Sequence, residues 1–359
     1  MNSNRSLLTL ALSAALVMSS AAADAAVFCV ADTTQLRNAV ETVSGASGAG
    51  SNEIRVQTGT YNIATGAGGN YALAITLNTT PLSITGGWNA ACTQRNQIAD
   101  ATILSGNNTV RLMSILALAD SSAELLIEGI SFRNGLTASG SLPSCLNIET
   151  DVNAGALLNL DRNTFRNCRG SSGTGPALSV RHRSGEVRIR SSVFTDNAGA
   201  SGTVGISNLG SGPIYFTGNT VAYNDDAGSL GGPAGIQASS LQSGAVWLVN
   251  NIVTNNGVAN SSDLFITSNS AVFSNSNVFG VLAGDLANLT QNNNLTGAAG
   301  FQSPTDLRLR SDSIARNSGA LSVIGGNTVL DVFGLPRQQG GRVDRGAHEF
   351  DELLVNGFE

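Results

Sequence analysis

Lysine is absent from this chain of 359 residues, and charged side chains make up only 12% of it. The formal net charge of −6 leaves no dense basic surface for a phosphate backbone, which argues against nucleic acid as a partner. Histidine is scarce, with only His182 and His348, and no two of the four cysteines have C-x-x-C spacing. The residue types and spacings of a zinc site are therefore missing, and we predict no metal site.

Long apolar runs are also missing, apart from a short one near the N-terminus. Arg5 precedes the apolar residues 6–18, and an Ala-x-Ala pattern follows at 23–25. This order is typical of an export signal, so we predict a signal peptide at residues 1–25 and a secreted product that is extracellular, periplasmic or held at the outer cell surface. No later stretch reaches the roughly 18 consecutive apolar residues of a transmembrane helix, and no membrane span is predicted.

The four cysteines are Cys29, Cys92, Cys145 and Cys168. An even number of cysteines in an exported protein predicts two disulfides, because the compartments outside the cytoplasm are oxidising. Three pairings are possible, and we favour Cys29–Cys92 together with Cys145–Cys168.

A repeat is the strongest pattern in the sequence. Each unit has two apolar residues at alternate positions, then a polar or glycine break, then an apolar anchor. Five such segments align without gaps, at 125–134, 158–167, 187–196, 214–223 and 246–255, and a weaker sixth begins at Ala271. The anchors are Phe132, Phe165, Phe194, Val221, Val253 and Val278.

This repeat predicts a parallel β-helix. Alternation with a period of two buries one face of a short strand, and Gly, Asn and Ser in the break tolerate the left-handed backbone of a sharp bend. Another short strand lies upstream in most units, so roughly 30 residues hold several strands, which fits one coil of a solenoid with a continuous core. We therefore expect an all-β, single-stranded right-handed parallel β-helix, forming one domain over residues 26–350.

The ends of such a solenoid expose strand edges that need covering. Residues 26–60 are expected to supply an N-terminal capping helix and the first strand, because residues 32–43 place apolar side chains on one helical face. The repeat decays near its end, so residues 281–350 are assigned to a C-terminal closing region and 351–359 to a tail. The apolar face of the helix comprises Leu36, Ala39, Val40 and Val43.

The breaks of the repeat also align polar side chains. The aligned positions are Asn163, Ser192, Asn219, Asn251 and Ser276. Because stacked amides satisfy one another's donors and acceptors, we expect a stabilising polar ladder inside the bends.

Several stretches resemble a known class of proteins. Residues 52–63 (NEIRVQTGTYNI), 82–89 (LSITGGWN) and 127–135 (IEGISFRNG) resemble the first coils of the bacterial right-handed β-helix, pectin-lyase-like superfamily. Residues 306–320 and 331–350 resemble the terminal region of the choice-of-anchor Q class of secreted β-helix proteins, although 306–320 lacks the usual Pro and Asp. The later terminal elements D-x-x-G-x-P-R and D-x-G-A-x-E are matched by Asp331, Gly334, Pro336, Arg337, Asp344, Gly346, Ala347 and Glu349.

The resemblance implies a secreted or surface-associated β-helix. It implies no single activity, because such folds include polysaccharide lyases, hydrolases and adhesins. The lyases use acidic residues to hold Ca²⁺ and an Arg or Lys as base, on the outer face of a sheet.

The aligned segments predict which side chains share an outer face. Four residues before successive anchors lie Glu128, Asp161 and Arg190, and neighbouring coils are about 4.8 Å apart, which predicts an acid–acid–base ladder. These three are candidate catalytic residues, although exposed charges usually form only surface ion pairs. Ca²⁺ is implied only for a lyase, because two carboxylates supply few of the six to eight oxygens that the ion takes. No other cofactor is predicted.

A neighbouring outward column lies six residues before the anchors and includes Arg188, Tyr215 and Trp247. Aromatic rings with polar tips offer flat apolar surfaces that suit stacking against sugars. We therefore treat these three residues as candidate ligand-binding residues.

Three functions remain open, and the oligomeric state is not predicted. The favoured one is a secreted or surface-associated β-helix that binds glycans or surface partners without catalysis, because a solenoid face repeats side chains over a long distance. The second is a polysaccharide lyase or glycoside hydrolase that acts on acidic polysaccharide through Glu128, Asp161 and Arg190. The third is a purely structural surface protein. No nucleophile–base–acid set or phosphate loop is visible.

Overall fold

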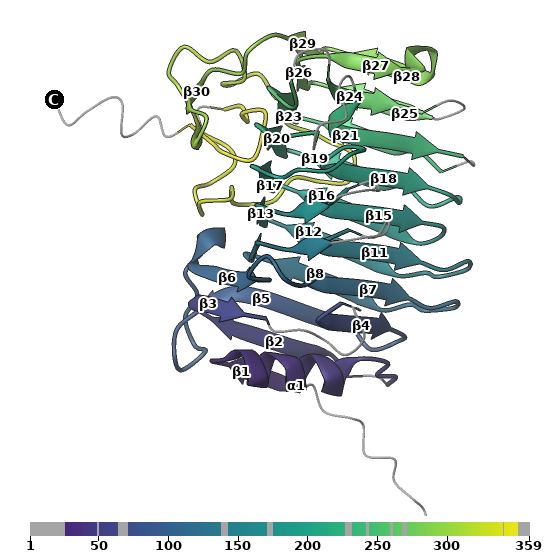
Figure 1. Cartoon of the computed structure of the whole chain (residues 1–359), viewed down its shortest axis with the longest axis vertical. Coiled ribbons are helices and arrows are strands. Elements are labelled where there is room, and N and C mark those ends of the chain that lie inside the picture. The colour runs from purple at the N-terminus through teal and green to yellow at the C-terminus, as the bar shows by residue number, and fades with distance from the viewer. Residues whose placement is uncertain are drawn as a thin grey trace, which may run out of the picture.

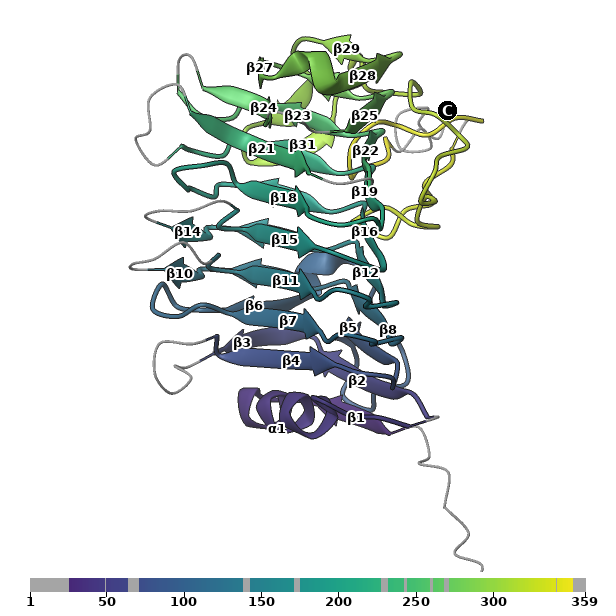
Figure 2. The same ribbon diagram turned by 90° about the vertical axis from the view of Figure 1, so that its right-hand side faces the viewer.

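The chain forms a parallel β-solenoid. Three parallel sheets of ten, nine and eight strands run along it, and we name them sheets A, B and C (Figure 1; Figure 2). The predicted parallel β-helix is thereby confirmed. The computed structural model describes residues 26–48, 50–63, 71–137, 143–170, 175–226, 232–241, 244–258, 261–267, 271–339 and 341–350. The expected signal peptide at 1–25 and the tail at 351–359 lie outside the described residues.

Most coils contribute one strand to each sheet. Sheet A contains β1 (Val27–Val30), β2 (Asn52–Gln57), β5 (Leu82–Trp88), β8 (Glu124–Glu128), β12 (Leu157–Asp161), β16 (Glu186–Arg190), β19 (Ile214–Thr217), β22 (Val246–Val249), β25 (Val272–Asn275) and β28 (Leu289–Asn292). Sheet B contains β3 (Gly59–Asn62), β6 (Thr102–Ser105), β9 (Ser131–Arg133), β13 (Thr164–Arg166), β17 (Val193–Thr195), β20 (Thr220–Ala222), β23 (Ile252–Thr254), β26 (Val278–Phe279) and β29 (Leu295–Thr296). Sheet C contains β4 (Leu73–Leu77), β7 (Met113–Ala117), β11 (Leu146–Thr150), β15 (Leu178–His182), β18 (Val204–Asn208), β21 (Pro233–Ser240), β24 (Ser262–Ile266) and β27 (Leu282–Gly284).

A few short elements lie outside the three sheets. Strands β10 (Leu136–Thr137) and β14 (Arg169–Gly170) form a parallel pair, and β30 (Phe301–Ser303) and β31 (Asp306–Leu309) form an antiparallel one. Two single 3₁₀ turns are η2 (Ala99–Ala101) and η3 (Leu286–Asn288).

Equal positions of the five aligned segments stack in register. Ile127 pairs with Leu160, which pairs with Ile189, and the row continues through Phe216 and Leu248. All five side chains are fully buried. The alternation of apolar residues therefore identified the inner face of these strands correctly.

The sixth segment is shifted by one residue from the predicted alignment. Phe279, not Val278, pairs with Val253 and enters the core between the sheets. Because a shift of one residue exchanges the two faces of a strand, Val278 belongs to a second apolar cluster on the outer side. The same shift in β25 places Phe273 beside Trp247 on the outer face of sheet A.

Aromatic rings stack inside the core beneath sheet B. The ring centroids of Phe132 and Phe165 lie 5.0 Å apart, and those of Phe165 and Phe194 lie 4.6 Å apart, with nearly parallel planes. Phe216 of sheet A packs against the end of this row, with its ring centroid 5.8 Å from that of Phe194. All four side chains are fully buried, so this row supplies a large share of the apolar contact between successive coils.

The predicted polar ladder in the bends forms, with one change. The Ser192 N–H donates to Asn219 Oδ1 (2.8 Å), and the Asn219 amide donates to Asn251 Oδ1 (3.3 Å). The Asn251 amide donates to Asn277 Oδ1 (2.9 Å). Asn277 therefore occupies the position predicted for Ser276, which is the same one-residue shift seen at the anchor.

Helix α1 (Thr33–Val43) covers the N-terminal end of the solenoid (Figure 1). The Asp32 side chain caps the helix by accepting a hydrogen bond from the Gln35 N–H (2.8 Å). All four predicted apolar residues of this helix are buried, and the helix packs on β1, β2 and β4. The predicted capping helix is confirmed.

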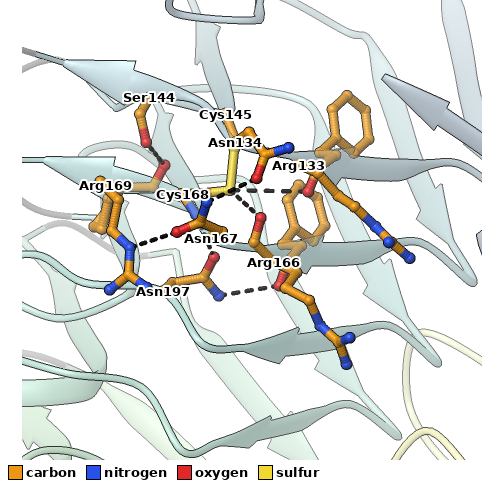
Figure 3. Close-up of a disulfide and its surroundings, with 12 residues drawn as sticks. Arg133, Asn134, Ser144, Cys145, Arg166, Asn167, Cys168, Arg169 and Asn197 are labelled. Carbon is orange, nitrogen blue, oxygen red and sulfur yellow. Dashed lines mark hydrogen bonds between the residues drawn. A yellow bond between two sulfur atoms is a disulfide. The ribbon is translucent and has the colours of Figure 1, made fainter. Parts of the chain in front are cut away.

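Both favoured disulfides are present. Cys29 and Cys92 are bonded, as are Cys145 and Cys168, and each pair has its Cα atoms 5.8 Å apart. Figure 3 shows the second disulfide beside the bend that follows β13. Because disulfides persist in oxidising compartments, the two bonds indicate an environment outside the cytoplasm.

The region expected to close the solenoid has two parts. Residues 282–296 form β27, β28 and β29, one further strand for each sheet. Beyond them the chain folds back along the flank of the solenoid, beside sheets A and B (Figure 1; Figure 2). We call residues 299–339 and 341–350 the C-terminal segment.

Apolar side chains attach the C-terminal segment to sheet B. Val193, Ile252 and Val278 pack in one buried cluster with residues of the segment, among them Phe301, Leu307, Leu309, Val332 and Ala347. Polar contacts add to this, since Arg345 Nη1 donates to the Asn277 carbonyl (2.7 Å). The segment therefore covers apolar outer positions that water would otherwise contact.

Buried charged residues organise the C-terminal segment internally. Arg337 donates to the carbonyls of Gly346 (2.9 Å) and Asp344 (3.1 Å), and its Nη1 lies 3.5 Å from Glu349 Oε2. Asp331 accepts hydrogen bonds from three backbone N–H groups. Burial raises the pKa of Glu349 to about 8, although Arg337 opposes this shift.

Replacing Phe165 with alanine tests the aromatic row. We expect Phe165→Ala to lower the free energy of unfolding by about 3–5 kcal/mol. The substitution removes the contacts with the rings above and below and leaves a cavity in the core. The measurement is a denaturant titration. Val152→Ala is the control, since Val152 is 55% exposed and its truncation should change the free energy by less than about 0.5 kcal/mol. Equal effects of the two changes would contradict the central role of the row.

The raised pKa of Glu349 predicts a pH dependence of the C-terminal segment. The folded state retains the proton that the unfolded chain releases near the ordinary value of 4.5, so the stabilisation is complete below that value and is lost as pH rises toward about 8. Between pH 6.5 and 8 the segment should lose about 1–2 kcal/mol of stability. Amide hydrogen exchange of residues 313–339, corrected for intrinsic rates, measures this loss. Glu349→Gln should remove the dependence, and an unchanged profile would refute it.

Candidate functional site

The predicted acid–acid–base ladder is contiguous. Asp161 pairs in register with Glu128 on one side and with Arg190 on the other. Residues 327–330 of the C-terminal segment face the ladder across a cavity of about 490 Å³. A hydrogen bond between the hydroxyl groups of Ser191 and Thr328, whose oxygens are 2.5 Å apart, connects residues 327–330 to the solenoid. The ladder therefore lines a partly covered cavity and not an open sheet surface.

Two arginines that the sequence did not identify hold Glu128. Arg95 Nη1 donates to Glu128 Oε2 (2.5 Å), and Arg162 Nε donates to Glu128 Oε1 (2.9 Å). Arg95 lies in the loop after β5, and Arg162 lies in the bend after β12 with a φ of 53°. Burial tends to raise the pKa of Glu128, but the two guanidinium groups outweigh it and hold the pKa below its ordinary value.

Arg162 also joins the ladder to the loop that contains Arg95. Its Nη1 donates to the Gln97 carbonyl (3.0 Å) and its Nη2 to Gln97 Oε1 (2.7 Å). Only 3% of the Arg162 side chain is exposed. Because nearly all of its donors are used inside the protein, Arg162 positions Glu128 and has little capacity left for a ligand.

Arg190 donates two parallel hydrogen bonds to Asp161. Its Nε and Nη2 donate to Asp161 Oδ1 and Oδ2 at 2.8 and 2.6 Å, which is the strong bidentate geometry. Burial raises the pKa of Asp161; Arg190 opposes the shift and the charge of Glu128 adds to it. The two neighbouring carboxyl groups are thus shifted in opposite directions.

The pairing limits what the ladder can do chemically. Arg190 is poorly placed to act as a base, because its Nε and Nη2 are both hydrogen-bonded to Asp161. Each carboxylate already contacts a guanidinium group, whereas Ca²⁺ needs six to eight oxygen ligands. Among the described residues, no three acidic, histidine or cysteine side chains converge on one point. These residues do not fit a calcium site.

The second predicted column continues as an aromatic row. Tyr215 and Trp247 are partners in register, and Phe273 follows with its ring stacked on that of Trp247, the centroids 4.3 Å apart. This stack covers one face of the Trp247 ring. Gly325 of the C-terminal segment touches Tyr215, since a Cβ on Gly325 would lie 2.5 Å from Tyr215 Cγ.

Positive charge exceeds negative charge around the cavity. Arg188, before Tyr215 in its column, forms an ion pair with Glu186 of the same strand, and its side chain is 30% exposed. The cavity itself is lined by Arg95, Arg162 and Arg190 against Glu128 and Asp161. One guanidinium charge is therefore left without a balancing carboxylate in the lining.

Comparison of the chain with protein-family models, with curated proteins and with solved structures gives no match. Within the part of the chain that the structure describes, no helix has the length and apolar character needed to cross a membrane.

Removing Arg190 tests the pairing within the ladder. In Arg190→Ala the pKa of Asp161 should rise further, because the opposing guanidinium is gone while burial and the charge of Glu128 remain. Carboxyl ¹³C chemical shifts followed against pH measure the change. Arg188→Ala is a matched control on the same strand and should leave the Asp161 titration unchanged. Equal responses in the two variants would show that Arg190 does not govern Asp161.

Proposed function

We propose that this chain is an extracellular β-helix protein that binds acidic polysaccharide along the outer face of sheet A without cleaving it. The observation that carries the proposal is the excess of guanidinium charge in the sheet A cavity, next to the partly exposed Arg188. Guanidinium groups recognise carboxylate and sulfate with paired hydrogen bonds. The aromatic row from Tyr215 to Phe273 extends this face by further coils.

The ion pairs within the acid–acid–base ladder favour binding of a polysaccharide over its cleavage. Glu128 forms ion pairs with two arginines, and Asp161 forms an ion pair with Arg190. A general acid, base or nucleophile needs to reach the substrate, whereas these groups would first have to leave their partners. Arg190 Nη1 has a weaker contact, 3.3 Å to the Gly325 carbonyl, so it is the ladder donor best able to turn to a ligand.

We also propose that the chain belongs to the pectin-lyase-like superfamily and its choice-of-anchor Q class, as a surface-associated protein. The support is structural. Asp331, Arg337, Asp344 and Glu349 of the terminal motif meet in the buried interior of the C-terminal segment. In this proposal the motif serves to fold that segment onto the flank.

Binding of polygalacturonate tests the main proposal. We expect isothermal titration calorimetry to detect binding that weakens at high salt, because the attraction is largely electrostatic. Trp247→Ala should weaken binding roughly tenfold, about 1.4 kcal/mol, through loss of ring contacts. Arg181→Ala is the control, since Arg181 pairs with Glu149 on sheet C, away from the proposed face. Binding that is absent, or equally sensitive to both changes, would refute the proposal.

A polysaccharide lyase or hydrolase is the second candidate. It is favoured by the opposite pKa shifts of Glu128 and Asp161, since an acid–base pair needs such a division. Incubation with uronic acid polymers, with and without Ca²⁺, tests it. Absorbance from unsaturated products, or new reducing ends, that disappears in Arg190→Ala would establish this candidate over non-catalytic binding. A purely structural surface protein predicts neither binding nor turnover.

A further inference from the structure

A second cavity lies on the other side of the bend, between sheet B and the C-terminal segment. Its volume is about 180 Å³, below the range of roughly 300–1,000 Å³ that is usual for drug-sized ligands. Strands β13 and β17 form one wall, and Val332, Phe333 and His348 belong to the other. This volume suits a small molecule or the end of a chain better than a segment from the middle of a polymer.

One of two neighbouring arginines at this wall has no ion-pair partner among the residues that the structure describes. Arg166 pairs in register with Arg133, and Figure 3 shows the two side chains projecting side by side. Arg133 has a carboxylate partner, Asp100, at 2.9 Å. Arg166 lines the cavity and has no ion-pair partner among the described residues. Like charges in register repel, so an anion beside Arg166 would relieve a cost already present in the strand pair.

The two carboxylates that line the cavity, Asp100 and Asp306, are each paired with an arginine outside the lining. Asp100 is bound by Arg133 and lies 2.8 Å from the Thr164 hydroxyl. Asp306 is bound by Arg308, whose Nε donates to it at 2.9 Å. When Arg133 and Arg308 are counted with the two acids and Arg166, these five groups carry one net positive charge.

His348 supplies an unused polar group in the same cavity. Its side chain is 5% exposed and packs against Phe333, with ring centroids 4.6 Å apart and ring planes tilted by 40°. Within the described residues, His348 Nδ1 is buried and has no hydrogen-bond partner. Burial lowers the pKa of His348 to about 3, so the ring stays neutral and offers one donor and one acceptor. A buried polar atom without a partner is costly, and a hydroxyl that reached Nδ1 after a small rotation of the ring would satisfy it.

We propose that this cavity binds a small carboxylate that carries a neighbouring hydroxyl group, with Arg166 holding the carboxylate and His348 the hydroxyl. Thr195, which also lines the cavity, offers a further hydroxyl contact. Two sources share this chemistry, a free hydroxy acid and the terminal uronic acid of a polysaccharide. The site does not depend on the proposed binding of polymer to sheet A, because none of the sheet A residues named above lines this cavity.

Three probes distinguish a general hydroxy acid site from a site for the end of a polysaccharide. Binding of each probe is measured by calorimetry and by the NMR signals of the histidine ring. The probes are D-galacturonate, D-galactose and lactate, each added to the full chain. Binding of galacturonate and lactate, but not of galactose, supports a general hydroxy acid site. Binding of galacturonate alone supports recognition of a polysaccharide end. Binding of galactose as strongly as galacturonate, or no binding of either acid at millimolar concentration, overturns the proposal.

Variants assign the site. Arg166→Gln should weaken galacturonate binding roughly tenfold or more, and Arg166→Lys should restore part of it, because the charge returns without the paired donors. Arg169→Gln is the control, since Arg169 follows on the same coil and pairs with the exposed Asp196. Thermal melting of each variant checks folding. Trp247→Ala should leave galacturonate binding intact while weakening the polymer, which separates this site from the sheet A face. Unchanged binding in folded Arg166→Gln would refute the assignment.

Discussion

Stacking in register is the constraint on which the other features depend. Hydrogen bonds between parallel strands fix each coil on the next, and the alternation of faces makes a position in one coil the neighbour of the same position in the coil above. The row of phenylalanines, the amides in the bends and the acid–acid–base ladder are three columns of this one arrangement. A site on the face of a sheet in this protein is therefore built from residues of several successive coils and not from a single strand.

The C-terminal segment covers part of a regular solenoid and helps to line two cavities. Val193, Ile252 and Val278 make the later part of sheet B apolar on its outer side, and the segment folds back to cover them. On one side it becomes the wall opposite Asp161, and on the other it brings His348 toward Arg166. The chemistry of both cavities thus combines a repeated surface with a segment that has no repeat.

Much of this arrangement could be predicted from the sequence, and the rest could not for definable reasons. Gapless alignment was enough to place Glu128, Asp161 and Arg190 in one row, because equal offsets become neighbours. Arg95 lies in an irregular loop, and its contact with Glu128 has no periodic signal. Arg162 lies in a bend, where the alternation of inward and outward residues does not predict which way a side chain points. In the sixth unit the apolar pair Val278 and Phe279 fitted either alignment, and only packing decided between them.

The contacts of the C-terminal segment reach from Gln97 to Asn277, across most of the solenoid. The segment therefore fits only if every coil between these two points has the correct length. A slip of one residue in any strand of that stretch would turn its outer side chains inward. The seating of the segment thus depends on the register of all the coils that it spans.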